Sequence, residues 1–475
     1  MVGCCRAPWT SLSLDPRGDV QACCQNQWLR LGNIRDATLL EIWRGPELER
    51  LRESIDRNDF RLGCDQCRIP VESSVPESAY FHNFDHLTPL DGRDPPWPVQ
   101  LELALSNTCN LRCVMCNGEL SSSIRSQREH RPPLQSPYGE SFFRELDQFL
   151  LRVTSVNFLG GEPLLARESL RVMDRLVELG VRPQCSVTTN GTIWNSRVAA
   201  LVETLGMEVA VSVDGLTDDL LSSVRVGIDP AQLRENLHRL KAATTAGGGS
   251  LRLLFSLLRT NWAELVDVLM LADQLDVDLG LNYVEHPVQQ SLVHGPLDEL
   301  QHAVATLSKD AGVRRLQRNR GVWEVNLSRL DAVLVERRAA GSPVSLSARS
   351  RVAGAEAEGA FESLVLTDNN QIVVGVDSRG TAPAGMDLDQ LLGASIWEVV
   401  GLVTGQLGRL VYSDHVAPSP SSGERLTFVF QRDDARFKMS AEMTDHTSES
   451  AEWRFCIERL PAGPSGAGRP AALAN

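Results

Sequence analysis

The middle of the chain alternates between two hydrophobic patterns. Strand-like runs, most of them closed by a turn, are followed by segments with helical apolar spacing. The strand-like runs occupy residues 99–106, 154–163, 184–191, 207–215, 251–258 and 277–286, and the clearest helical segments are 168–180 and 262–275. Because alternating strands and helices form a parallel sheet with right-handed crossovers, the pattern predicts an α/β fold. We expect a partial (β/α)6 barrel with functional groups at the carboxyl ends of its strands.

The flanking sequence differs in character from this central segment. Residues before the proline-rich segment 95–98 are rich in cysteine and contain a predicted helix or two within 37–55. Beyond the barrel the chain reads as helical, then as strands, and it ends in a Pro-, Gly- and Ala-rich tail typical of disorder. The expected domains are 1–75 (cysteine-rich), 97–300 (barrel), 301–345 (helical connector), 355–460 (α+β) and 461–475 (disordered tail).

Composition and charge narrow the possible partners. The chain has 475 residues, of which 42% are hydrophobic, enough for more than one core. Its formal net charge is −14, so neither a nucleic acid nor an anionic membrane is an expected partner. The N-terminal residues lack the basic and apolar regions of a signal peptide, and no run approaches the length of a membrane span. We therefore expect a cytoplasmic protein.

The cysteines indicate metal binding. Nine of the 11 fall within the first 116 residues, a crowding typical of metal ligands rather than of a disulfide scaffold. The segment CNLRCVMC holds Cys109, Cys113 and Cys116 directly after the first strand of the predicted barrel. Three thiolates can hold three irons of a [4Fe-4S] cluster and leave the fourth iron open to a small chelating ligand. A zinc site completed by a distant fourth ligand is the alternative.

These cysteines, followed by GGEP at 160–163, TTNG at 188–191 and VSVDG at 211–215, resemble the radical S-adenosylmethionine (radical SAM) superfamily over residues 99–290. The resemblance implies that the three cysteines bind a [4Fe-4S] cluster whose open iron chelates S-adenosylmethionine. Reduction of the cluster would then yield a 5′-deoxyadenosyl radical, which takes hydrogen from a substrate. The resemblance also implies cofactor contacts at Met115, Gly160, Gly161, Glu162, Pro163, Asn190, Ser212, Asp214 and Arg225.

The chemistry of these residues suits such contacts. The two glycines permit close backbone approach to a ligand, and Glu162 can accept from the methionine ammonium. Ser212 and Asp214 can hydrogen-bond ribose or ammonium, while Arg225 suits the methionine carboxylate. Two alternatives stay open, namely Arg225 as a solvated surface charge and Asn190 as a simple turn former. The methionine before the third cysteine stands where the family often has an aromatic residue beside the adenine.

The N-terminal cysteines resemble a second pattern. A cysteine, a later Gly-x4-Cys and the closing CDQC at 64–67 resemble the SPASM/Twitch auxiliary-cluster domains of radical enzymes, which usually follow the barrel rather than precede it. The resemblance implies that Cys5, Cys23, Cys64 and Cys67 bind a second [4Fe-4S] cluster with no open iron. Cys4 could replace Cys5, and Cys24 could replace Cys23. A structural zinc site is the alternative.

The C-terminal segment carries a weaker pattern. Residues 364–400 loosely resemble the opening of a PAS domain, with later strands predicted at 425–431, 436–444 and 452–460. Cys456 lies on the last of these apolar strands, where a buried core residue is the favoured interpretation and a reactive thiol the other.

The combined resemblance predicts a radical SAM enzyme that receives electrons from a flavodoxin or ferredoxin and acts on a sugar, an oligosaccharide or a peptide. Epimerisation is the favoured net reaction, with dehydrogenation and peptide cross-linking as alternatives. An epimerase needs a hydrogen donor, and the candidate thiols are Cys24, Cys4, Cys456 and Cys185, the last expected to be structural. A non-catalytic iron–sulfur and PAS-like sensor of redox state or of S-adenosylmethionine is the alternative from another class.

Overall fold

The structure of the chain is a computed structural model. It describes residues 5–26, 29–72, 79–90, 95–339, 361–368, 373–379, 425–432, 435–446 and 450–459. The chain forms two compact units, Met1–Val335 and Glu336–Asn475. Within the described ranges, no helix is both long enough and apolar enough to cross a bilayer.

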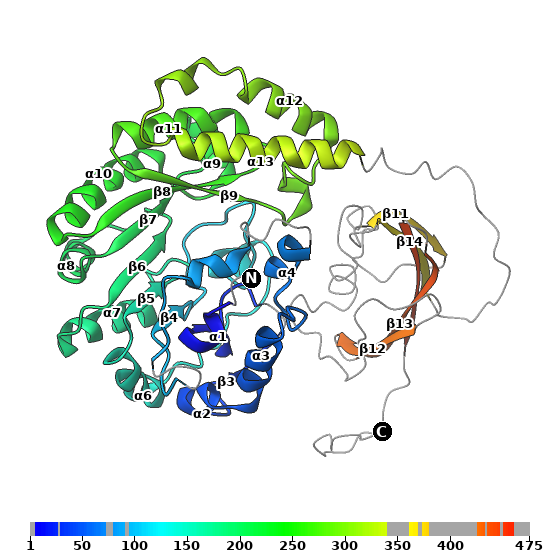
Figure 1. The fold of residues 1–475 in the computed structure, drawn as a ribbon, viewed down its shortest axis with the longest axis horizontal. Coiled ribbons are helices and arrows are strands. Elements are labelled where there is room, and N and C mark those ends of the chain that lie inside the picture. Colours follow the sequence, from blue (N-terminus) through cyan, green and yellow to red (C-terminus); the bar gives the residue numbers. More distant parts are fainter. Residues whose placement is uncertain are drawn as a thin grey trace. The chain divides into compact units, whose positions relative to one another are not determined.

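Six parallel strands form the centre of the first unit. They are β4 (Gln100–Leu103), β5 (Ser155–Phe158), β6 (Gln184–Thr189), β7 (Glu208–Ser212), β8 (Ser250–Leu257) and β9 (Asp278–Tyr283). Each pairs with the next in chain order. The connecting helices are α5 (Ser122–Gln127), α6 (Glu140–Leu150), α7 (Arg167–Leu179), α8 (Ser196–Leu205), α9 (Asp218–Val224), α10 (Pro230–Gly247) and α11 (Leu265–Gln274), which follows the 3-10 turn η3 (Trp262–Glu264). Helices α7, α8 and α10 lie along the outer side of the curved sheet (Figure 1). The predicted partial (β/α)6 barrel is confirmed.

Local sequence sets the ends of several of these helices. The side chain of Asn195 accepts from the backbone N–H of Val198 and so caps the start of α8. Asp229 does the same for α10, whose first residue is Pro230, a residue that fits the first turn because its missing N–H needs no partner there. Helix α7 ends at Gly180, which has φ 67° and supplies the left-handed turn expected from the sequence.

The N-terminal residues extend the barrel sheet instead of forming a separate layer. After α1 (Ala7–Thr10), strand β1 (Ser11–Leu14) pairs in parallel with β4. Strands β2 (Asp19–Gln21) and β3 (Gly32–Asn33) then add antiparallel, giving a nine-stranded sheet in the order β3-β2-β1-β4-β5-β6-β7-β8-β9. The remaining N-terminal elements are α2 (Leu39–Trp43), α3 (Pro46–Asp56), α4 (Asp65–Glu72) and the 3-10 turn η2 (Tyr80–Phe84).

The two faces of the sheet carry different side chains. Leu101, Leu103, Val156, Phe158 and Cys185 belong to the buried apolar core. Successive strand residues point to opposite faces, so the face opposite this core carries Glu102, Asn157 and Ser186, which are neighbours in the strand register. Ser186 Oγ donates to Asn157 Oδ1 at 2.8 Å. The barrel therefore has a polar face on the side away from its apolar core.

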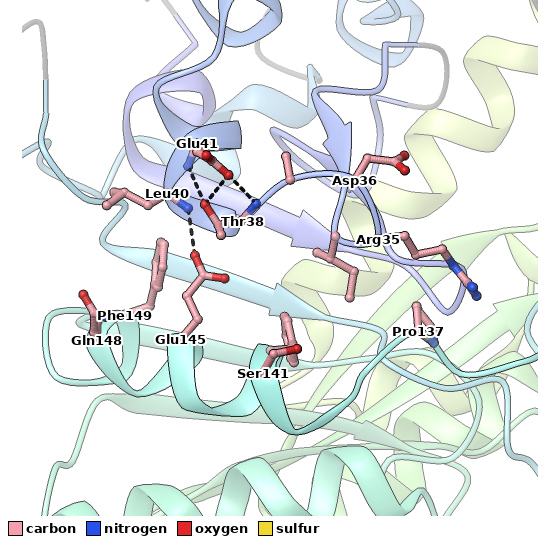
Figure 2. Close-up of a pocket in the computed structure, with 13 residues that line it drawn as sticks. Arg35, Asp36, Thr38, Leu40, Glu41, Pro137, Ser141, Glu145, Gln148 and Phe149 are labelled. Carbon is pink, nitrogen blue, oxygen red and sulfur yellow. Dashed lines mark hydrogen bonds between the residues drawn. The ribbon is translucent and has the colours of Figure 1, made fainter.

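A groove separates the N-terminal elements from α6 on the surface of this unit. It has a volume of about 550 Å³ and lies between residues 34–41 and α6 (Figure 2). Glu145 of α6 crosses to the other wall, where its Oε1 accepts from Leu40 N at 3.1 Å. Thr38 and Glu41 form a capping box at the start of α2. None of the residues expected to contact a cofactor lines this groove.

Helices complete the barrel after β9. They are α12 (Leu297–Leu307) and α13 (Arg320–Ala339), with the short turns η4 (Val288–Gln290) and η5 (Ala311–Arg315) beside them. Asn319, fully buried just before α13, accepts from Leu279 N at 2.8 Å and donates to Val277 O at 2.9 Å. This side chain ties the start of α13 to β9.

The second unit contains one antiparallel sheet. Its strands are β10 (Phe361–Asp368), β11 (Val373–Arg379), β12 (Arg425–Arg432), β13 (Ala435–His446) and β14 (Ser450–Arg459), in the order β11-β10-β14-β13-β12. Strands β12, β13 and β14 agree with the three strands predicted from the sequence. The helical part of the PAS-like prediction lies outside the described residues, so the PAS-like fold stays a prediction. Cys456 lies on β14 opposite Glu362 and Ser440.

Candidate functional site

The three cysteines of the 109–116 segment lie together beyond the carboxyl end of β4. Cys113 is buried, and Cys109 and Cys116 are partly buried. Burial, followed by the nearby Cys113 and Cys109, raises the pKa of the Cys116 thiol to about 11. No three His, Cys, Asp or Glu side chains in the described part of the chain gather around one point as they would for a single metal ion. The ligands of a cubane bind separate irons, so they need not converge on one point.

Helix α5 holds the backbone of the cysteine segment. Ser123 Oγ donates to Cys109 O at 2.7 Å, and Cys109 N donates to Ser122 Oγ at 3.1 Å. Ser121, the N-cap of α5, donates to Leu111 O at 2.7 Å. Arg128 then donates to the carbonyl oxygens of both Cys113 and Cys116. A run of serines that looked unremarkable in the sequence therefore positions the cysteines.

The GGEP segment packs directly on the residues that lead into the cysteines. Gly161 N donates to Ser106 O at 3.0 Å, and Glu162 N donates to Thr108 O at 2.8 Å. A Cβ at Gly161 would lie 2.4 Å from Thr108 O, and one at Gly160, where φ is 109°, would lie 2.8 Å from Ser106 O. The close approach that these glycines allow in the structure is thus to protein backbone. Pro163 is buried in the same turn.

Glu162 already has protein partners for both of its carboxylate oxygens. Oε1 accepts from Thr189 Oγ1 at 2.7 Å and from Leu164 N at 3.1 Å, while Oε2 accepts from Asn190 N at 2.7 Å. The residue is fully buried, and burial raises the pKa of its carboxyl group. In this arrangement the carboxylate joins the ends of β5 and β6, and the expected ammonium contact stays a prediction.

Asn190 and Arg225 both aim N–H groups at cysteine sulfurs. Asn190 Nδ2 donates to Cys109 Sγ at 3.8 Å, and Arg225 Nη1 donates to Cys113 Sγ at 3.8 Å. Asn190 also accepts, through Oδ1, from Thr192 Oγ1 at 2.6 Å, a contact that fits its expected turn geometry. Hydrogen bonds to sulfur favour the thiolate and influence the reduction potential of an iron–sulfur cluster.

Arg225 forms a buried ion pair with Asp214. Arg225 Nη2 lies 2.6 Å from Asp214 Oδ2, with the two side chains 8% and 0% exposed. The other oxygen of Asp214 accepts from Ser256 N at 2.6 Å. The structure therefore excludes a solvated surface charge at Arg225. Among the described residues, Arg225 Nε is buried and has no hydrogen-bond partner, so one donor of this guanidinium is available to a ligand.

The two remaining expected contacts lie at the same end of the barrel. Ser212 is the last residue of β7 and is partly buried. Met115 packs beside Val224, Leu258 and Val284. The side chain thus contributes to an apolar cluster near the ends of β8 and β9.

The N-terminal thiols form a second group. The pKa of the Cys23 thiol is raised, first by burial and then by Glu102 and the nearby Cys24, Cys5 and Cys64. Asn26 Nδ2 donates to Cys64 Sγ at 3.3 Å. Cys67 N donates to Cys64 O at 2.9 Å, which places the two cysteines of CDQC in one turn. Cys4 lies outside the described residues.

Cys24 lies in a small polar cluster that the sequence did not indicate. Its Sγ is 3.3 Å from Tyr80 Oη, and its N–H donates to Glu102 Oε2 at 2.8 Å. Burial, with Glu102 next, raises the pKa of Cys24 to about 12. Glu102 lies on the polar face of β4, and Tyr80 belongs to η2. These partners are 56 and 78 residues away along the chain, so no local motif could have identified them.

The other candidate hydrogen donor in the barrel has a different position. Cys185 is 1% exposed and lies in the apolar core with Val187, its neighbour on the same face of β6. Burial raises its pKa to about 12. This environment agrees with the structural role that was expected for Cys185.

Both thiol groups suit iron–sulfur clusters. The cysteines lie close enough to affect each other's pKa, and the amide of Asn190 and the guanidinium of Arg225 supply donors to sulfur at the first group. Asn26 supplies one at the second. Such donors stabilise metal-bound thiolates, which burial alone would disfavour.

Comparison with known proteins gives a family match for each segment that holds one of the two thiol groups. Residues 103–272 match the radical SAM superfamily, and residues 4–68 match SPASM, an iron–sulfur cluster-binding domain. A probable GTP 3′,8-cyclase of Sulfurisphaera tokodaii is 30% identical over 189 residues, which are 40% of this chain and 56% of that protein. The GTP 3′,8-cyclase of Mycobacterium ulcerans is 36% identical over 119 residues, 24% of this chain and 31% of that one. The chain thus spans less than two thirds of these relatives.

The solved structures that match this chain are less similar to it in sequence than these relatives. SuiB of Streptococcus suis, bound to its precursor peptide SuiA, is 15% identical with a TM-score of 0.35, covering 54% of this chain and 61% of that one. The anSMEcpe structure with bound AdoMet is 18% identical with a TM-score of 0.35, covering 44% and 58%.

The structure combines a partial (β/α)6 barrel with two groups of neighbouring thiols, one beyond β4 and one in the N-terminal elements. By the two family matches, the chain carries a radical SAM domain over residues 103–272 and, ahead of it, a SPASM domain over residues 4–68. The radical SAM domain implies a [4Fe-4S] cluster with S-adenosylmethionine, and the SPASM domain implies auxiliary iron–sulfur binding.

Proposed function

We propose that this protein is a radical SAM enzyme, with Cys109, Cys113 and Cys116 as ligands of the S-adenosylmethionine-binding cluster. The observation that carries the proposal is the arrangement at β4, where three thiols lie together and two of their sulfurs accept N–H groups from Asn190 and Arg225. When bound and reduced, the cluster and its cofactor would supply a 5′-deoxyadenosyl radical able to take hydrogen from an unactivated C–H bond.

The residues around the cluster would bind and orient the cofactor. We assign the methionine carboxylate to Arg225, because its buried Nε has no partner among the described residues and its charge suits a carboxylate. Ser212 and Met115 would contact the nucleoside. Glu162 would hold Asn190 and the GGEP turn in place through its hydrogen bonds. Its contact with the methionine ammonium stays a prediction.

We propose Cys5, Cys23, Cys64 and Cys67 as ligands of the auxiliary cluster. Support comes from the shared environment of Cys5, Cys23 and Cys64, and from the turn that joins Cys64 to Cys67. Anaerobically reconstituted protein should hold about eight irons per chain if both clusters are cubanes. Replacing Cys109, Cys113 and Cys116 with Ala should leave about half of this iron. Loss of all iron in that variant, or zinc at both sites, would contradict the assignment.

Formation of 5′-deoxyadenosine tests the activity itself. Reconstituted protein should release it from S-adenosylmethionine when dithionite or a reduced flavodoxin or ferredoxin supplies electrons. The triple Ala variant should not. A wild-type protein that binds S-adenosylmethionine without releasing 5′-deoxyadenosine, even with cell extract as the source of substrate, would support a non-catalytic sensor instead.

For the net reaction we propose epimerisation of a sugar or peptide carbon, with Cys24 as the hydrogen donor. Its support is the cluster with Tyr80 and Glu102, which gives this thiol polar neighbours on the polar face of the barrel. Cys4 and Cys456 remain further candidates. Dehydrogenation and peptide cross-linking are the alternative net reactions. GTP cyclisation is a further candidate, because two relatives are named GTP 3′,8-cyclase.

Deuterium oxide distinguishes these reactions, because a thiol proton exchanges with solvent. An epimerase should place one deuterium at the inverted carbon, and Cys24→Ala should stop product formation while 5′-deoxyadenosine is still released. Cys185→Ala is the matched control, since that thiol lies in the apolar core and should not return hydrogen. Product that is two hydrogens lighter and lacks solvent deuterium would contradict epimerisation. Cyclised GTP would assign the reaction of the relatives.

A further inference from the structure

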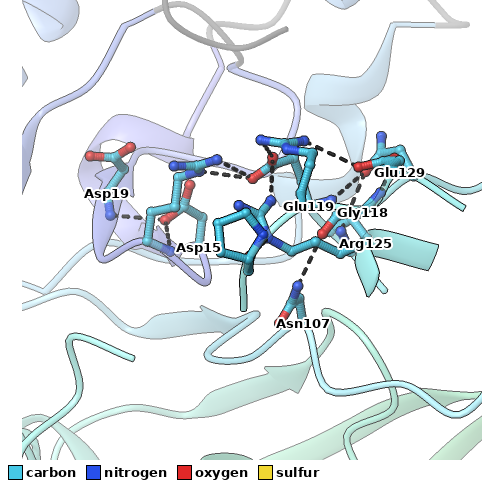
Figure 3. A network of polar contacts seen from close by, with 12 residues as sticks. Asp15, Asp19, Asn107, Gly118, Glu119, Arg125 and Glu129 are labelled. Atoms are coloured by element: carbon cyan, nitrogen blue, oxygen red, sulfur yellow. Dashed lines mark hydrogen bonds and ion pairs between the residues drawn. The ribbon is translucent and has the colours of Figure 1, made fainter. Parts of the chain in front are cut away.

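A network of charged side chains joins the N-terminal domain to the cysteine segment. Its centre is Glu119, three residues after Cys116 (Figure 3). Glu119 Oε2 accepts from Arg17 Nε at 2.8 Å, and Arg17 Nη2 lies 2.5 Å from the same oxygen. Glu119 Oε1 lies 3.1 Å from Arg125 Nη1 and 2.8 Å from Arg131 Nη2. We call these four residues the Glu119 network.

Arg17 lies in a hydrogen-bonded turn of the auxiliary domain. The turn connects β1 to β2, and these strands are flanked by the expected auxiliary ligands Cys5 and Cys23. Asp15 Oδ1 accepts from Arg17 N at 2.8 Å and from Asp19 N at 2.9 Å, while Tyr138 donates to Asp15 O. The position of Arg17 therefore depends on the order of the β1–β2 hairpin.

On the other side, Glu119 is coupled to the backbone next to Cys116. Gly118 N donates to Glu129 Oε1 at 2.7 Å, and Asn107 Nδ2 donates to Gly118 O at 3.0 Å. Arg125, whose side chain is 7% exposed, is part of α5, the helix that holds the cysteines. Glu119 is thus joined to α5 through Arg125, and to the backbone of Gly118, two residues after Cys116, through Arg131 and Glu129.

The charge balance makes Arg17 important for this arrangement. Burial alone raises the pKa of Glu119, yet Arg17, Arg131 and Arg125 together hold it below its ordinary value. The Arg17 and Glu119 side chains are only 33% and 26% exposed, so the pair is less screened than a surface ion pair. Arg17 is the only one of the three arginines that comes from the auxiliary domain.

We propose that Arg17 is a positioning residue: through Glu119 it fixes the Cys116 end of the cysteine segment to the auxiliary domain, and order in that domain thereby strengthens S-adenosylmethionine binding in the barrel. The proposal rests on the proposed function, because it takes residues 109–116 to hold the cofactor's cluster. It assigns a coupling between two sites that share no ligand.

The first test needs no cluster. Amide hydrogen exchange of the segment 113–121 should be faster in Arg17→Gln and in Glu119→Gln than in wild type, in protein free of iron, because the segment loses an anchor. Arg171→Gln is the matched control, since Arg171 pairs with Glu140 at 2.6 Å on the exposed surface and is not part of the Glu119 network. Unchanged exchange in Arg17→Gln, or an equal rise in the control, would overturn the proposal.

The second test measures cofactor affinity in reconstituted protein, by the change that S-adenosylmethionine causes in the electron paramagnetic resonance spectrum of the reduced cluster. Arg17→Gln should bind about fivefold more weakly, with unchanged iron content. The double variant Arg17→Gln/Glu119→Gln should bind no more weakly than Glu119→Gln alone, because Arg17 acts only through Glu119. Wild-type affinity in Arg17→Gln, or additive losses, would overturn the coupling. A wild-type protein that binds no S-adenosylmethionine would contradict the proposed function, and amide exchange would then still decide whether Arg17 holds the segment.

Discussion

Individual residues of the site have partners that sequence spacing could not reveal. Arg225 and Asp214 were expected as separate cofactor contacts, whereas they form one buried ion pair. Glu162 was expected to face the cofactor, and its oxygens are occupied by Thr189, Leu164 and Asn190. The identities of these residues were evident from motifs at strand ends. Their pairings were not, because a motif specifies which groups are present at a strand end and not which of them neutralise each other.

The Asp214–Arg225 pair makes a prediction about stability. In cluster-free protein, Arg225→Met should lower the free energy of unfolding by about 3–5 kcal/mol, because it leaves the buried Asp214 carboxylate without its cation. Adding Asp214→Asn should recover most of that loss, since no unpaired charge then remains. Urea unfolding followed by circular dichroism measures both changes.

The matched control for this prediction is an exposed pair. Arg175→Met removes the ion pair with Asp147, in which the Arg175 and Asp147 side chains are 40% and 26% exposed. It should lower the free energy of unfolding by less than about 1 kcal/mol. If Arg225→Met costs no more than Arg175→Met, the buried pair does not stabilise the barrel as the structure suggests.

At the scale of elements, the sequence predicted the barrel well and the N-terminal domain only in part. The six strands β4–β9 follow the alternating pattern because each must bury one apolar face under a helix. Strand β1, only Ser11–Leu14, contains two serines, and its partner β4 lies more than 80 residues later. A strand this short has no periodicity to detect, and its pairing across that distance depends on tertiary packing. The sequence therefore indicated a cysteine-rich domain and not its continuity with the barrel sheet.

Because β1 belongs to the same sheet as the barrel strands, a substitution in the β1–β2 hairpin should change the free energy of unfolding of the whole first unit. Leu12 of β1 is fully buried beside Leu101 of β4, its register partner. Leu12→Ala should therefore lower the free energy of unfolding by about 2–5 kcal/mol through lost burial and the cavity left behind. Tryptophan fluorescence and circular dichroism should still report one shared transition, because β1 belongs to the same sheet as the barrel.

Leu151→Ala serves as the control for that substitution, since Leu151 is 55% exposed and should contribute little. An early separate transition in Leu12→Ala, with the barrel unfolding at its wild-type urea concentration, would show that the N-terminal domain is an independent folding unit.

At the scale of the whole molecule, the proposed cofactor sites all lie in one of the two compact units. Both thiol groups, the polar face of the barrel and the Glu119 network belong to Met1–Val335. The sequence predicted strands in the second unit, yet no residue there identifies a bound ligand.

This division predicts that the second unit is dispensable for cofactor chemistry. A chain ending at residue 339 keeps α13 and should hold about eight irons and release 5′-deoxyadenosine with dithionite at the rate of the full chain. A chain ending at residue 316 is the control. It loses Asn319, which bonds both Leu279 N and Val277 O, together with the buried Trp323 of α13, and should be destabilised or fail to fold. Iron content, 5′-deoxyadenosine release and the urea midpoint, measured on both truncated chains, check the prediction. If the chain ending at 339 folded with full iron and yet released no 5′-deoxyadenosine, the second unit would be part of the catalytic machinery, and the chemistry could not be assigned to the barrel and its auxiliary domain alone.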